Sequence, residues 1–257
     1  MHQPFLIKAE KHHYQRIKCS LSDLFVARAP VSVVFFYQVI ISEEKLIQAL
    51  KKVLTDFPIF AGILIKKNHQ LYIDCNNQGV QVRIEHLTVP LSMTPELTTL
   101  SADNLVDIIS ARQALKYQKP LFTIRLRYHP NGMTIGYSFQ PTSIQDFLQK
   151  FHELKKLNRV LPEDLTPKYK NLIISNWCNF GVYAVDFGIE APYLFLPVGK
   201  APFPWLSCIV EGPNNEGLLM SIVLPRAVAS RLSKISSPFE SIAPSSTPSS
   251  LGYNLSS

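Results

Sequence analysis

The sequence lacks most of the short patterns that mark a metal, nucleotide or nucleophile site. Its four cysteines lie far apart and include no Cys-x-x-Cys pair, which argues against the common zinc sites and a disulfide framework. None of its ten glycines forms a phosphate-binding Gly-x-Gly-x-x-Gly or Gly-x-x-x-x-Gly-Lys pattern, and no Gly-x-Ser-x-Gly turn is present. We therefore expect no metal site, no tightly bound cofactor and no nucleotide-binding fold.

Long hydrophobic runs are also missing. The longest, residues 31–41, is interrupted by Ser32 and Gln38 and is shorter than the ~20 residues that cross a bilayer. Residues 1–8 reach a charged side chain after three consecutive apolar residues, too few for a secretory signal. Together with the unpaired cysteines, these features predict a soluble cytoplasmic protein with no membrane span.

The charge of the chain is modestly basic and evenly spread. The net charge is +7, but the lysines occur as scattered pairs such as Lys51-Lys52, with no nucleic-acid-binding motif around them. A hydrophobic content of 46% over 257 residues supports one large or two small domains with a real core. We therefore expect a globular protein without a nucleic-acid partner.

The first 140 residues have the pattern of a mixed α/β unit. Residues 31–41 are rich in Val, Ile, Phe and Tyr, which predicts a strand buried on both faces. Ser42 followed by two glutamates is a favourable helix start, and apolar residues then recur at helical spacing up to Pro58. The other predicted elements of this half are strands over 70–74, 80–86, 121–128 and 133–139 and a helix over 102–114.

The apolar period changes from two to 3.6 after Pro141. Ser143 and Asp146 form a candidate capping box for an amphipathic helix that continues to Leu154. The remaining segments, assigned from composition, are a polar linker at 158–171, strands between 172 and 224, a short helix at 225–234 and a disordered Ser/Pro-rich tail at 236–257.

Three separated runs form a set that is more specific than any one of them. They are residues 21–24 (LSDL), residues 54–62 (LTDFPIFAG) and Asp186-Phe187-Gly188. The set resembles the LSxLD, VL.DFYPLAGRL and DFGWG segments of the BAHD acyltransferases, a family whose enzymes move an acyl group from a coenzyme A thioester to an alcohol or an amine. The two strands predicted before Gln140 also resemble the pair that delivers the active-site turn in that family.

The resemblance implies an α/β protein with the mixed-sheet, chloramphenicol acetyltransferase-like fold of coenzyme A-dependent acyltransferases. Only 46 positions separate Gln140 from Asp186, whereas a segment comparable to a whole domain lies between the corresponding motifs of the family. We therefore expect an incomplete second domain. The implied organisation is an N-terminal acyltransferase-like domain (1–157), a linker at an internal deletion (158–171), a C-terminal acyltransferase-like segment (172–235) and the tail (236–257).

The active-site turn departs from the family pattern. The resemblance implies a histidine just after the strand at 133–139, four residues before an aspartate, where it acts as a general base. Gln140 and Pro141 stand there instead, followed by Gln145 and Asp146, and none of the seven histidines has an aspartate four residues later. Glutamine does not titrate and proline lacks a backbone N–H. We therefore expect no catalytic residue in this degenerate motif.

Other histidines and aromatics have simpler interpretations. His129 is a candidate substitute base, but its place at a strand-to-turn junction predicts an exposed side chain, and His152 flanks an apolar helix face. We expect the aromatic residues of the run before residue 188 to be core, namely Trp177, Phe180, Tyr183 and Phe187.

The motif at residues 186–188 is expected to be structural. In the family the corresponding aspartate is an ion-pair residue remote from the reaction centre, which implies the same role for Asp186. Phe187 and Gly188 would supply a packed aromatic and a turn, whereas Ile189 and Glu190 replace the final Trp-Gly of the family motif.

Three functional hypotheses stay open. The first is an acyltransferase relative, inactive as written, with acyl-CoA as co-substrate and a small hydroxyl or amine acceptor if it were active. The second is a non-catalytic binding or regulatory module, in which the sheet surface left uncovered by the missing segment pairs with another chain, including a second copy. The third is an unstable variant without a role of its own.

Overall fold

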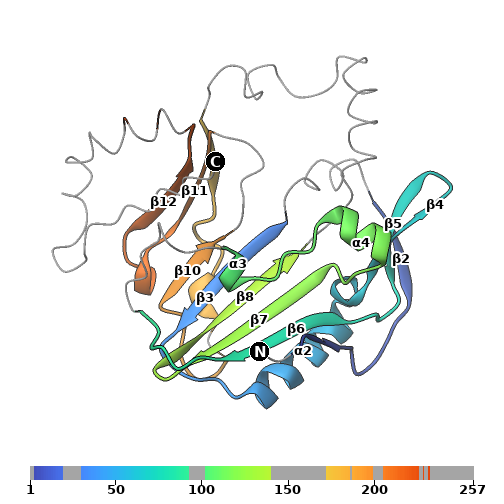
Figure 1. Cartoon of the computed structure of the whole chain (residues 1–257), viewed down its shortest axis with the longest axis horizontal. Coiled ribbons are helices and arrows are strands. Elements are labelled where there is room, and N and C mark those ends of the chain that lie inside the picture. Colours follow the sequence, from blue (N-terminus) through green and yellow to red (C-terminus); the bar gives the residue numbers. More distant parts are fainter. Residues whose placement is uncertain are drawn as a thin grey trace.

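The computed structural model organises the chain around three β-sheets (Figure 1). The larger sheet has six strands in the order β1-β6-β7-β8-β3-β10, and two smaller sheets have the orders β2-β5-β4 and β12-β11-β9. The structure describes residues 3–19, 30–92, 102–139, 172–185, 187–198, 205–225, 228 and 231.

The six-stranded sheet is mixed. Its strands are β1 (Phe5–Ile7), β6 (Val80–His86), β7 (Phe122–His129), β8 (Gly132–Phe139), β3 (Val31–Tyr37) and β10 (Leu194–Pro197). Only the β6–β7 pair is parallel, and β7 and β8 form the predicted hairpin with a two-residue loop. This arrangement confirms the expected mixed-sheet α/β class.

Strand β3 is buried on both faces, as its composition predicts. Val33, Phe35 and Tyr37 belong to the core cluster on one face, whereas Val34 and Phe36 belong to the cluster on the other. The strand ends at Tyr37, earlier than the apolar run that predicts it. A strand can be apolar at every position only where both faces of its sheet are covered.

Helix α2 (Glu43–Asp56) covers one face of this sheet, behind it in Figure 1. The Ser42 hydroxyl accepts a hydrogen bond from the Lys45 amide, which confirms the predicted N-cap. Leu46 and Leu54 are buried against the sheet, and the 3₁₀ turn η1 (Pro58–Ala61) follows the helix.

The helix predicted over 102–114 is two short helices, α3 (Ala102–Leu105) and α4 (Ala111–Tyr117). The chain between them is held by the sheet, because the Asp107 carboxylate pairs with Arg83 and Arg125 of the neighbouring strands. Gly136 permits the close approach of α3, since a Cβ at this position would collide with the Leu105 carbonyl oxygen. Tertiary contacts therefore override the local helical pattern.

The two smaller sheets flank the six-stranded one. Their strands are β2 (Gln15–Lys18), β5 (Gln70–Cys75) and β4 (Ile63–Lys67) in one sheet, and β9 (Ile173–Asn176), β11 (Leu206–Glu211) and β12 (Leu218–Val223) in the other. The short strands β1, β2 and β4 were not predicted from the sequence. In the second sheet β9 pairs parallel to β11 and β12 antiparallel to it, and the 3₁₀ turns η4 (Val182–Ala184) and η5 (Pro213–Asn215) lie in its connections.

The β12-β11-β9 sheet joins the main core through one face. Val210, Cys208 and Leu219 pack against the core cluster of the six-stranded sheet. No helix in the described ranges is long and apolar enough to cross a membrane.

Several expected segments lie outside the described residues. They are the LSDL run at 21–24, the helix after Ser143, the linker at 158–171, most of the helix at 225–234 and the tail at 236–257.

Candidate functional site

The end of strand β8 is the candidate site, because the chain leaves the sheet there for Gln140 and Pro141, where the resemblance implies the active-site turn. Phe139, the last residue of β8, lies opposite Val31 of β3 and Phe122 of β7. Three aromatic rings gather at this end: the centroid of Phe60 lies 5.1 Å from that of Phe122 and 5.4 Å from that of Phe139. The resulting surface is apolar and holds no charged side chain among these residues.

The other face of the same strand ends carries small hydroxyl side chains. The Ser32 and Ser138 hydroxyl oxygens lie 2.8 Å apart in a buried hydrogen bond, and the Thr123 hydroxyl donates to the Asp107 carbonyl oxygen. These hydroxyls are satisfied within the fold, and their partners in these hydrogen bonds are a hydroxyl and a backbone carbonyl, not a histidine or a carboxylate side chain. They stabilise the strand ends and are not activated nucleophiles.

The residues of the degenerate motif lie outside the described residues. Gln140, Pro141, Gln145 and Asp146 follow directly after Phe139 in the sequence, so the structure defines only the point from which they leave the sheet. Close to that point, burial raises the pKa of Tyr137 well above its ordinary value. A phenol that stays protonated at neutral pH cannot act as the missing base.

His129 lies at the opposite end of the β7–β8 hairpin. It pairs with Gly132, whereas the candidate site lies at Phe122 and Phe139, roughly 23 Å along the strand. Its Nδ1 lies 2.8 Å from the Val89 carbonyl oxygen and therefore donates to it, and burial lowers the pKa of the ring. The prediction of a solvent-exposed side chain was wrong: His129 is partly buried, because the chain around Val89 lies against this end of the hairpin. The distance removes His129 as a substitute base for the β8 turn.

The motif at residues 186–188 lies against the end of strand β3. Asp186 is outside the described residues, but the Tyr37 hydroxyl donates to the Val185 carbonyl oxygen at 2.9 Å and the Tyr37 ring meets that of Phe187 edge-on at 6.0 Å. Gly188 has a φ of 71° with open space where a Cβ would stand, so backbone conformation and not crowding favours glycine.

The four aromatic residues between positions 177 and 187 that were predicted to be core divide into two classes. Trp177 and Tyr183 pack against the main core, and the Tyr183 hydroxyl donates to the Gly212 carbonyl oxygen at 2.6 Å. Phe180 is 67% exposed and Phe187 40% exposed, so the prediction that all four are core was wrong for these two. Both lie in turns outside the strands, where an alternating burial pattern does not apply.

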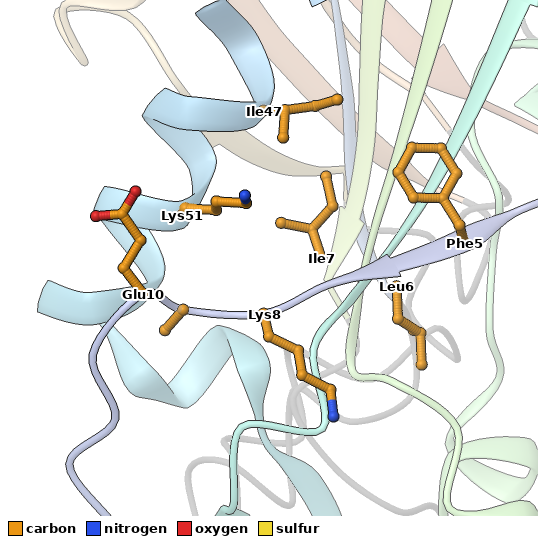
Figure 2. Close-up of a pocket in the computed structure, with 8 residues that line it drawn as sticks. Phe5, Leu6, Ile7, Lys8, Glu10, Ile47 and Lys51 are labelled. Carbon is orange, nitrogen blue, oxygen red and sulfur yellow. The ribbon is translucent and has the colours of Figure 1, made fainter. Parts of the chain in front are cut away.

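A separate shallow pocket lies between β1 and α2, with a volume of about 460 Å³ (Figure 2). In this view Ile7 and Ile47 point into the space between the two elements, whereas the Lys8 ammonium group points away from it. The pocket is at the sheet edge, three strands from β8, and it supplies no group to the candidate site. Sequence reasoning did not identify it. Within the described ranges, no three His, Cys, Asp or Glu side chains gather as a metal site.

Comparison with known proteins agrees with this architecture. The profile of the Transferase family matches residues 2–160. The structure of vinorine synthase superposes with a TM-score of 0.64 at 14% identity, over 89% of this chain and 95% of that chain. The structure of F. sporotrichioides TRI101, complexed with coenzyme A and T-2, superposes with a TM-score of 0.57 at 13% identity, over 85% and 97%. No curated protein matches the chain at the level of sequence.

Proposed function

The chain belongs to the Transferase family, the BAHD acyltransferases, and from this membership we propose that it keeps the scaffold of these enzymes without transferring acyl groups. The observation that carries the proposal is the Gln140-Pro141 pair directly after β8, where the family pattern has its catalytic histidine. The proposed role is therefore that of a degenerate family member.

The loss of the base removes one large contribution to the rate. A positioned general base contributes typically ~10² to 10⁴ in rate, since it removes the acceptor's proton as the acyl carbon is attacked. Gln140 cannot take that proton. Among the described side chains at the β8 end, the aromatic residues and the satisfied hydroxyls offer no replacement.

The shortened middle of the chain supports the same proposal. In the family, the segment between the two motifs carries much of the coenzyme A surface and one wall of the acceptor channel, and here Gln140 and Asp186 are 46 positions apart. Without that wall the thioester is not oriented. Proximity and orientation are worth up to ~7–11 kcal/mol of a reaction barrier.

The ligands of a fold relative support the proposed substrate class. TRI101 is complexed with coenzyme A and T-2. If this chain were active, acyl-CoA would be its co-substrate and a small hydroxyl or amine compound its acceptor, with no tightly bound cofactor.

Thiol release from acyl-CoA tests the proposal. With short, long and aromatic acyl-CoA donors and a mixture of hydroxyl and amine acceptors, we expect no coenzyme A release above the uncatalysed rate. Gln140→His and Pro141→His should each fail to restore it, because a base without an oriented donor has no substrate to act on. Enzymatic release that His129→Ala or His152→Ala abolishes would overturn the proposal and identify the substitute base.

A binding module is the second candidate function. It is favoured by the apolar surface of the β12-β11-β9 sheet, on which Ile174 is 53% exposed and Leu218 69% exposed. Exposed apolar surface of this kind marks an interaction site or an aggregation hazard. Light scattering at micromolar protein should show self-association, and a clean monomer that binds no hydrophobic dye would argue against the module.

A further inference from the structure

Sheet edges differ sharply in how they are protected. An edge strand exposes unpaired backbone groups, and proteins normally shorten it, charge it or place proline in it to prevent pairing with another chain. In the described sheets, β1 has three residues, β9 and β10 have four each and β10 ends in Pro197, β2 carries Arg16 and Lys18, and β4 ends in Lys66 and Lys67.

Strand β12 has none of these protections. It is six residues long, reads Leu-Leu-Met-Ser-Ile-Val, and contains neither a charge nor a proline. In a chain of net charge +7, no charged residue occurs between Glu216 and Arg226. Leu218 and Met220 are exposed on the face that points away from the main core.

The backbone of β12 is paired on one side. Its ladder runs antiparallel to β11 from Leu218 to Val223, and β12 is the outermost strand of its sheet (Figure 1). In a strand paired on one side, alternate residues direct their N–H and C=O groups to the open edge. The only other backbone hydrogen bond to β12 among the described residues is from the Trp205 amide to the Val223 carbonyl oxygen.

We propose that β12 pairs antiparallel with β12 of a second copy of this chain, which joins two three-stranded sheets into one of six strands. The proposal rests on the binding-module function and names its partner, and it does not depend on whether acyl transfer occurs. A twofold axis through the pairing makes the interface self-complementary, as in most homodimers.

The alternation of side chains determines the register. Leu218, Met220 and Ile222 share the outward face, and opposed residues of an antiparallel pair must lie on the same face. An axis through Met220 satisfies this condition, with Met220 opposite its own copy and Leu218 opposite Ile222 of the second copy. The apolar row of one copy then continues into that of the other.

The absence of charge on β12 favours a second copy of this chain as the partner of its open edge. Identical strands that carry like charges would repel one another when they pair, as two copies of β2 or β4 would. Two copies of β12 bring no charge together despite the basic net charge of the chain. A lysine introduced at the centre of the pairing should therefore prevent it.

Sedimentation of the full chain and two lysine variants tests the edge. We expect the wild-type chain to sediment as a dimer at micromolar concentration, and Met220→Lys to be monomeric with an unchanged circular dichroism spectrum. Ile174→Lys is the matched control, since it lies on the same face at the opposite edge of the sheet. It should stay dimeric. If Met220→Lys proves unstable, Leu218→Lys, at the most exposed position of the strand, replaces it.

Crosslinking tests the register. Met220→Cys should form a disulfide-linked dimer on mild oxidation by oxygen, because opposed Cα atoms lie ~4.5–5.5 Å apart. Leu218→Cys, displaced from the axis, should form little. A monomeric wild-type chain would overturn the proposal. Loss of the dimer in Ile174→Lys as well would assign the contact to the apolar face and not to the β12 edge. Thiol-release activity in any of these chains would contradict only the proposed loss of catalysis.

Discussion

The six-stranded sheet and the β12-β11-β9 sheet belong to one chain but are built differently. The first is covered on both faces, with Phe35 in one core cluster and Phe36 in the other. The second has one face against the main core and one that exposes Ile174 and Leu218. The difference indicates that the six-stranded sheet supplies most of the stability, whereas the β12-β11-β9 sheet retains an exposed face for contacts.

The two sheets also differ in the number of charged side chains that form ion pairs. On the six-stranded sheet, Glu85 lies 2.7 Å from Arg125 and 3.2 Å from Arg127, and Asp107 lies 2.8 Å from Arg83. The second sheet carries no such network among its described residues, and its edge strand is uncharged. Paired charges hold the connections of the first sheet in place, whereas the second sheet has single hydrogen bonds, such as those accepted by the Glu211 carboxylate and the Ser175 hydroxyl.

The largest contrast is expected from the same substitution in both regions. Met133 is fully buried in the six-stranded sheet and its sulfur accepts a hydrogen bond from the Ile41 amide, whereas Met220 is 39% exposed on β12. Met133→Ala should lower the free energy of unfolding by ~2–5 kcal/mol. Met220→Ala should change it by less than about 0.5 kcal/mol. Urea unfolding at low protein concentration measures both, and equal losses would contradict the comparison.

Removal of the carboxylate from the charge network should have the next largest effect. Burial alone would raise the pKa of Glu85, but the hydrogen bond from Arg125 and the charges of Arg127 and Arg83 outweigh it and hold that pKa below its ordinary 4.5. Glu85→Gln should cost about 3 kcal/mol at pH 7, since it removes the carboxylate charge that Arg125 and Arg127 face and leaves Asp107, 3.6 Å away, as the carboxylate beside Arg125.

The difference in stability between the wild-type chain and Glu85→Gln should depend on pH. Because the folded-state pKa is depressed, the stabilisation by Glu85 is complete above pH 4.5 and is lost as the pH falls through the folded value. Melting curves should therefore show the wild-type chain losing its advantage over Glu85→Gln below pH 4.5. A constant difference down to pH 2 would contradict the assignment.

A third substitution addresses the motif that joins the regions. We predict that Asp186 is structural, as implied by its family position, and that Asp186→Ala lowers the free energy of unfolding by roughly 1–3 kcal/mol. Asp186→Asn, which keeps the size and part of the hydrogen bonding, should cost less. Thermal unfolding measures both, and an unchanged melting temperature in the alanine variant would mean that the family role does not apply here.

A smaller loss of stability than that of Asp186→Ala is expected where β3 contacts that motif. Tyr37→Phe removes the hydroxyl that donates to the Val185 carbonyl oxygen and should cost about 0.5–1.5 kcal/mol. Proteolysis in the run around Phe187 should become faster, because this bond links the run to the buried sheet. Tyr183→Phe is the control, because the Tyr183 hydroxyl donates to the Gly212 carbonyl oxygen and not to the run around Phe187. It should leave cleavage at Phe187 unchanged.

The success of sequence reasoning depended on whether a signal was local. Strand β3, helix α2 with its Ser42 cap and the β7–β8 hairpin each have their cause within a few neighbouring residues, and all three were predicted. The helix at 102–114 failed because Asp107 forms ion pairs with distant strands. A turn at Phe187 and Gly188 was predicted and is present, but Phe187 was also assigned to the core, because composition does not show how far a ring in a turn is exposed.

For the candidate site, the sequence by itself supplies the residues on which the proposed loss of chemistry rests. A glutamine and a proline cannot supply a general base in any fold, so Gln140 and Pro141 are informative without coordinates. Only the tertiary structure decided that His129 lies at the far end of the hairpin and that β12 is an outer strand of its sheet among the described residues. The physical reason is that side-chain chemistry belongs to each residue, whereas distance and edge position arise from pairings between strands far apart in the chain.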